Sequence, residues 1–184
     1  MPNEKSNKNK TDMIFKDKRN EIIFNCLKNL TNISIEKKID YIIISTENHI
    51  FTNSYQNLLF KSTINEAAYY NCDILCGGLA DFNNAVVITP SLIWVDRFIN
   101  SNYLIVFNKF FQQMKEITPL QTINNLNDLT VNKMVVFPFI SSHNTLIAQS
   151  STDKEILVDA IKMRENRASQ KLELYIKGFR RFNN

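Results

Sequence analysis

The chain lacks any long apolar run. No segment approaches the roughly 20 consecutive apolar residues that a membrane-spanning helix needs. Residues 1–12 are hydrophilic, rich in Lys and Asn, and without the apolar stretch of a secretory signal. Their low hydrophobicity predicts a disordered tail. We therefore expect a soluble, cytoplasmic protein with no transmembrane segment.

Cysteine is sparse as well. Three cysteines, Cys26, Cys72 and Cys76, lie in or beside apolar segments, and the chain contains no Cys-x-x-Cys pair. A zinc site is therefore not expected. The pattern favours buried, reduced thiols, which are the usual state of cysteine in the cytoplasm.

Charge of one sign is not concentrated along the chain. The 22 Lys and Arg are mixed with 18 Asp and Glu, which gives a formal net charge of +4. Binding to nucleic acid would require a focused basic patch, so we expect no nucleic-acid partner. By contrast, the 44% hydrophobic content, with 13 Phe, is sufficient for a substantial core.

Glycine is the scarcest of the structure-breaking residues. Only 3 are present, and two of them, Gly77 and Gly78, are adjacent and follow the apolar segment 72–76. A glycine pair in such a chain marks a place where the backbone needs unusual dihedral angles or a close approach by another segment.

The spacing of apolar residues predicts alternating helices and strands. The strand segments are apolar at consecutive positions, which suits strands covered on both faces. We predict an α/β fold: a mostly parallel central sheet flanked by helices, with a long C-terminal helix. The predicted helices cover 17–30, 53–70 (with Ser54 as N-cap), 110–117 and 152–177, and the strands cover 40–45, 72–76, 85–89, 92–95, 103–107 and 132–139. The predicted divisions are a tail (1–12), an α/β domain (13–150) and a C-terminal helix with a basic tail (151–184).

Polar residues stand at two of the predicted strand ends. Thr46-Glu47-Asn48-His49 follows the strand at 40–45, and His143 follows the strand at 132–139. In open α/β sheets ligands bind at the carboxyl ends of strands. If both ends lie on one edge, the two histidines of the chain would approach one another.

Four segments resemble a known family in their order and spacing. They are "DYIIISTENHIFTNSY" (40–55), "NEAAYYNCDILCGGLADFNNAVVIT" (65–89), "LIWVDRFINSNYLIVFNKFF" (92–111) and "LTVNKMVVFPFIS" (129–141). Together they resemble the lipopolysaccharide-type galactosyltransferases, glycosyltransferase family 25, particularly its short members. The resemblance covers about residues 19–142.

The resemblance implies a GT-A fold and transfer of a sugar from a nucleotide-sugar donor to an acceptor. In this family an acidic cluster at the strand end holds Mn²⁺ or Mg²⁺, which bridges the donor phosphates. The matching positions here are Glu47, Asn48 and His49, with Glu47 as the principal metal ligand. The glycine pair is assigned to the binding of the donor.

The chain departs from the family where donor and metal bind. Thr46-Glu47-Asn48-His49 stands in place of Glu-Asp-Asp-His, so a single carboxylate remains. Residues 118–127 contain no acid ahead of the Asn-Lys-Met strand, and the usual first nucleotide-binding strand has no counterpart. Two hypotheses follow: a metal-assisted glycosyltransferase, or a catalytically inactive relative that serves as a binding or scaffolding module.

Further candidates each have a structural alternative. Asp96 is the second catalytic candidate, as an acceptor-binding group, or else a partner of Arg97. Asp81 either faces the donor site or hydrogen-bonds its own turn. Lys133 either pairs with the donor diphosphate or is solvated. The interleaved charges of the C-terminal helix indicate a solvated face, and a homo-oligomer formed through this helix is the alternative.

Overall fold

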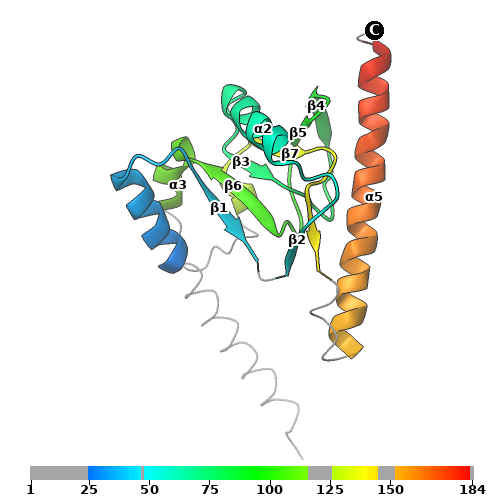
Figure 1. The fold of residues 1–184 in the computed structure, drawn as a ribbon, viewed down its shortest axis with the longest axis horizontal. Coiled ribbons are helices and arrows are strands. Elements are labelled where there is room, and N and C mark those ends of the chain that lie inside the picture. The colour runs from blue at the N-terminus through cyan, green and yellow to red at the C-terminus, as the bar shows by residue number, and fades with distance from the viewer. Residues whose placement is uncertain (1–24, 47, 116–125, 145–151, 183–184) are drawn as a thin grey trace, which may run out of the picture.

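The computed structural model describes residues 25–46, 48–115, 126–144 and 152–182, which form an α/β fold around a six-stranded sheet (Figure 1). A small second sheet pairs β2 (His49–Phe51) with β8 (Ser141–His143). The tail predicted over 1–12 lies outside the described residues. In spatial order, the main sheet consists of β1 (Tyr41–Ser45), β6 (Tyr103–Phe107), β3 (Ile74–Cys76), β7 (Lys133–Val136), β5 (Leu92–Val95) and β4 (Ala85–Thr89).

Each predicted helical segment overlaps a helix with different ends, whereas the helix at Leu126–Leu129 and the strands β2 and β8 were not predicted. The first described helix covers 25–36, beyond the predicted end at residue 30. The C-terminal helix reaches Phe182, so most of the predicted basic tail is helical. The remaining elements are α2 (Asn57–Tyr69), the 3₁₀ turn η1 (Asn108–Phe110), α3 (Phe111–Lys115), α4 (Leu126–Leu129) and α5 (Thr152–Phe182).

The expectation of a mostly parallel sheet is wrong. Within the described residues, β3 and β7 are the only neighbouring strands that run parallel, and the other neighbours in the main sheet are antiparallel. Consecutive apolar residues indicate that both faces of a strand are buried, but they do not indicate whether the strand runs parallel or antiparallel to its neighbours. The two-residue connection at 90–91 between β4 and β5 permits only an antiparallel pair.

Two helical layers cover the two faces of the sheet. Because side chains alternate along a strand, Leu75, Ile105 and Met134 pack with Phe60 and Ile64 of α2. The neighbouring strand residues face the opposite layer, which α3, α4 and α5 contribute to. That second cluster includes Ile74, Val106, Val135, Phe111, Leu126 and Leu172. Burial on both sides accounts for the continuous apolar runs of the inner strands β3, β6 and β7. In the edge strands β1 and β4 the prediction was wrong in part, because Ile43 is 44% exposed and Val86 is 54% exposed.

The start of α2 differs from the prediction. Gln56, not Ser54, occupies the N-cap position, and its side chain makes no capping hydrogen bond. The Ser54 backbone N–H instead donates to the Thr52 hydroxyl at 3.2 Å. This local bond holds residues 52–54 in a turn before the helix, so the hydroxyl that resembled a cap lies outside it.

Helix α5 packs along β4 and β8, and its C-terminal end extends beyond the sheet (Figure 1). Ala168, Leu172 and Ile176 are buried in the core at helical spacing, whereas Leu174 is 68% exposed. Among the described residues, no helix has both the length and the apolar character needed to cross a membrane. A homo-oligomer formed through α5 stays a prediction.

The three cysteines are free thiols. Cys72 and Cys76 are buried as predicted, and burial raises the pKa of both, that of Cys76 to about 12. These two thiols therefore stay protonated and unreactive at neutral pH. Cys26 is exposed, so the prediction was wrong there; the adjacent Leu27 is the residue that packs against the core.

Candidate functional site

The two histidines of the chain lie opposite one another. β2 and β8 are antiparallel, and their register pairs His49 with His143 and Phe51 with Ser141. Directly opposed residues in such a pair have Cβ atoms about 4.5–5.5 Å apart. The Asn144 N–H donates to the Asn48 carbonyl at 2.7 Å and closes the end of this small sheet. The prediction that the histidines approach one another is confirmed.

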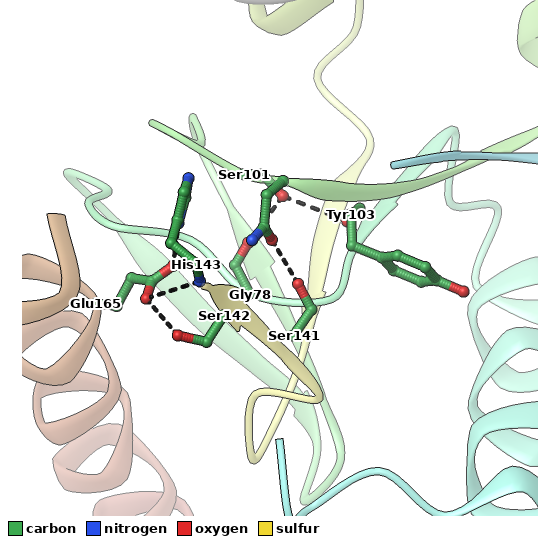
Figure 2. A network of polar contacts seen from close by, with 8 residues as sticks. Gly78, Ser101, Tyr103, Ser141, Ser142, His143 and Glu165 are labelled. Carbon is green, nitrogen blue, oxygen red and sulfur yellow. Dashed lines mark hydrogen bonds and ion pairs between the residues drawn. The ribbon is translucent and has the colours of Figure 1, made fainter. Parts of the chain in front are cut away.

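A buried carboxylate from α5 holds His143. The Nδ1 of His143 lies 2.7 Å from Oε1 of Glu165, and the Ser142 hydroxyl donates to Oε2 at 2.7 Å. Glu165 is only 5% exposed, and Figure 2 shows Ser142 and His143 directed toward it. A carboxylate on Nδ1 fixes the tautomer and the ring orientation, so Nε2 remains as the acceptor nitrogen.

His49 lies within an aromatic cluster. Its ring stacks on Tyr103 with centroids 4.7 Å apart and meets the edge of Phe51 at 4.5 Å. Its Nε2 is buried and has no hydrogen-bond partner among the described residues. Burial lowers the pKa of His49 below its ordinary value of 6.5, because the charged ring would lose solvation.

This burial predicts a pH-dependent stability. The native state favours neutral His49, so its contribution is fully present above pH 6.5 and is lost as the pH falls toward the lower native pKa. His49→Phe keeps an aromatic ring beside Tyr103 and removes the titration. We expect the urea midpoint to fall less for this variant than for the parent between pH 7.5 and about 5.5. If the urea midpoints of the parent and of His49→Phe fell by the same amount over this pH range, the expectation would be contradicted.

The glycine pair lies where β3 meets β8. A Cβ on Gly78 would stand 2.3 Å from the Ser141 carbonyl oxygen, and one on Gly77 would stand 2.9 Å from Cδ1 of Tyr103. Neither glycine has a positive φ. The predicted close approach is therefore confirmed, and the segment that approaches is the protein's own β8. Binding of a donor by the pair stays a prediction.

A polar network ties this junction to β6. The Ser141 hydroxyl donates to Oδ1 of Asn102 at 2.5 Å, and the Ser101 hydroxyl donates to the Gly78 carbonyl at 2.7 Å. The Nδ2 of Asn102 is buried and has no partner among the described residues. In Figure 2 this network lies beside the group formed by Ser142, His143 and Glu165.

Glu47, the principal candidate, lies outside the described residues. The other predicted site residues, Asp81, Lys133 and Asp96, make contacts away from the histidine pair. Oδ1 of Asp81 accepts the N–H of Phe82 at 2.8 Å, which is the turn alternative. Lys133 is 2% exposed, and its ammonium donates to the carbonyls of Asn127 at 2.7 Å and Thr130 at 2.5 Å. Desolvation lowers the pKa of this lysine.

Asp96 holds a loop. Its carboxylate accepts the N–H of Asn83 at 3.1 Å and the side-chain amide of Asn84 at 2.8 Å. Desolvation would raise the pKa of Asp96, but the hydrogen bonds from Asn84, Asn83 and Arg97 outweigh it, and the net pKa is lowered. These contacts are to the loop before β4, so the bonds of Asp96 serve the turn rather than the histidine pair.

Sequence reasoning missed Glu165. The acids of α5 were interpreted as members of a solvated face, yet Glu165 shares the buried side of the helix with Ala168, Leu172 and Ile176. The spacing of these positions, three, four and four residues, places them in one stripe. A lone carboxylate inside an apolar stripe was the available signal.

A cleft of about 200 Å³ lies between α5, β8 and the segments that follow β2 and precede β8. Glu165 and Asn166 line its helical side, and Pro138 and Phe139 supply apolar contacts. The remaining lining residues carry hydroxyl groups: Thr52, Ser54, Ser141, Ser142 and Ser169. Three of these hydroxyls already donate within the protein, Thr52 to the Phe139 carbonyl, Ser141 to Asn102 and Ser142 to Glu165, and each keeps acceptor capacity on its oxygen.

Comparison with protein-family models gives no match to the chain, and comparison with curated proteins gives none either. Within the described residues, no three His, Cys, Asp or Glu side chains gather in a way that would hold a metal ion. Because residue 47 is outside that set, the predicted ligand group of Glu47, Asn48 and His49 stays a prediction.

Proposed function

We propose that the chain is a glycosyltransferase-like domain that transfers a sugar from a nucleotide-sugar donor with the help of a divalent cation. The observation that carries the proposal is the pairing of His49 with His143 across β2 and β8. In the sequence, His49 directly follows Glu47 and Asn48. The resemblance assigns metal and donor binding to this strand end. The proposal adds His143 to the expected ligands.

The side-chain types of Glu47, Asn48, His49 and His143 would suit a cation at this strand end. Carboxylate and amide oxygens suit Mn²⁺ and Mg²⁺, and an imidazole can add a nitrogen ligand. The contact of Glu165 with Nδ1 of His143 leaves Nε2 available, as in histidines that bind metals. When bound, the cation would neutralise charge on the departing diphosphate.

The proposal concerns the site and does not depend on a GT-A sheet. The family's sheet is expected to be mostly parallel, whereas this one contains the single parallel pair β3–β7 within the described residues. The proposed site requires only that β8 lies against the end of β3. The missing side chains of Gly77 and Gly78 permit that approach.

The first test is a ligand-dependent thermal shift. Mn²⁺ together with uridine diphosphate should raise the melting temperature, because a ligand that binds only the native state stabilises it by about 2.7 kcal/mol at 100 times its Kd. The shift should be lost in Glu47→Gln and in His143→Gln. The matched control is Asp81→Asn, whose carboxylate bonds to its own turn and should be dispensable.

Two outcomes would overturn the proposal. One is the absence of any shift with millimolar Mn²⁺ and uridine diphosphate. The other is a shift of equal size in the parent, Glu47→Gln and His143→Gln. Binding at the predicted strand end must depend on these two side chains, whereas nonspecific metal binding would not.

The alternative is a catalytically inactive relative that binds ligands or partners. The retention of a single carboxylate in Thr46-Glu47-Asn48-His49, where the family has Glu-Asp-Asp-His, favours it. A sensitive assay of nucleotide-sugar hydrolysis distinguishes the two functions. Slow hydrolysis that disappears in Glu47→Gln would support the enzyme, and ligand-dependent stabilisation without hydrolysis or transfer would support the inactive relative.

A further inference from the structure

The cleft beside α5 and β8 combines an apolar surface with many polar side chains. As in most small-molecule pockets, the larger part of its surface is apolar. Seven of its nine lining residues nevertheless carry a hydroxyl, amide or carboxylate group. Its volume of about 200 Å³ is below the roughly 300–1,000 Å³ typical of drug-sized ligands. Its dimensions therefore suit a ligand of about one ring.

The charge of the lining excludes anionic ligands. None of the described residues that line the cleft is Lys, Arg or His, and its one charged side chain is Glu165. Phosphate and carboxylate groups are recognised by Arg, Lys or helix N-termini. A phosphorylated ligand would bring its charge against the Glu165 carboxylate without compensation.

Glu165 is positioned to accept further hydrogen bonds. Its Oε1 contacts Nδ1 of His143, and its Oε2 accepts the Ser142 hydroxyl at 2.7 Å and the His143 N–H at 3.5 Å. A carboxylate has about four lone-pair sites in all, so capacity remains for a hydroxyl donor of a ligand, chiefly at Oε1. Because the existing contacts fix its orientation, the carboxylate is organised before any ligand arrives.

We infer that this cleft binds a neutral, polyhydroxylated ligand of about one sugar ring, with Glu165 as the principal hydrogen-bond acceptor. Ser169 and Asn166 of α5 face the same ligand from the helix, and Pro138 and Phe139 contact its apolar C–H groups. As the acceptor subsite, this assignment rests on the proposed function. As a binding site, it is independent of that function.

Ligand-observed NMR titration with glucose, glucose 6-phosphate and glucuronate tests the chemical class. Glucose should bind, and each anionic analogue should bind at least tenfold more weakly, which corresponds to about 1.4 kcal/mol. Equal or tighter binding of either anion would overturn the inference, as would the absence of binding by glucose and other neutral hexoses.

Two variants locate the site. Ser169→Leu places a larger apolar side chain into the cleft, and Gln170→Leu is the matched control because residue 170 is exposed outside it. Only Ser169→Leu should abolish binding of glucose, with the melting temperature of both variants near that of the parent. Glu165→Gln should weaken binding at least tenfold. Unchanged binding in Ser169→Leu would place the sugar elsewhere and refute the assignment.

The two proposals fail separately. A protein that keeps its Mn²⁺ and uridine diphosphate shift but binds no neutral sugar would overturn the cleft inference alone. A protein that binds glucose in a Ser169-dependent manner but gives no shift with the metal and nucleotide would overturn the proposed function and leave the binding site intact.

Discussion

Gly78→Ala is expected to destabilise the protein by about 3 kcal/mol or more, at the upper end of the cost of overpacking. The added Cβ would lie 2.3 Å from the Ser141 carbonyl oxygen, and that oxygen is backbone rather than the end of a flexible side chain. β3 and β8 would have to separate. Urea denaturation at pH 7.5 should report the loss as a lower midpoint.

Gly178→Ala is the matched control. Nothing lies within 4 Å of a Cβ at this position, which is inside α5. Alanine in a helix interior is favoured over glycine, so this variant should gain about 0.5–1 kcal/mol. If Gly78→Ala lowers the free energy of unfolding and Gly178→Ala raises it, the close approach at residue 78 is the cause of the loss. A Gly78→Ala protein as stable as the parent would contradict the described junction.

Leu172→Ala should cost about 2–5 kcal/mol in the free energy of unfolding, as expected for a fully buried leucine. Leu172 is 0% exposed and packs in the same cluster as residues of the sheet. The substitution leaves a cavity between α5 and the body of the protein. Because the helix carries Glu165, a loosened α5 should also weaken binding in the cleft.

Leu174→Ala controls for helix propensity. Leu174 lies two residues away on the same helix and is 68% exposed. Its replacement should change stability by no more than about 0.5 kcal/mol. If both substitutions had the same small effect, α5 would not be docked on the sheet, and the cleft with Glu165 would lose its structural basis.

The strands were predictable from sequence because their signal is local. The segments at 85–89, 92–95 and 103–107 are β-branched or aromatic runs, and the structure has β4, β5 and β6 at those same bounds. The direction of the strands was not predictable from burial alone, since a strand covered on both faces has the same composition in either orientation. The two-residue connection at 90–91 did indicate an antiparallel pair, but the prediction of strand direction relied on the burial pattern instead.

The site was predictable only in part. Strand ends and glycine scarcity pointed to the junction around residues 46–49 and 77–78, and to an approach of the two histidines. The contact of His143 with Glu165 joins residues that are 22 positions apart in sequence. No spacing rule relates them, because their meeting depends on how α5 packs against β8.

The sequence by itself determined the strands of the main sheet, the burial of its inner strands and the place where two backbones must touch, but not the small sheet of β2 and β8. These follow from the period of apolar residues and from the absence of a side chain at Gly77 and Gly78. The tertiary structure alone decided the direction of the strands outside the β4–β5 pair and the partner of His143. Strand direction and the contact of His143 depend on which surfaces pack together between segments far apart in the chain. The free energy of such contacts cannot be inferred from a local sequence pattern.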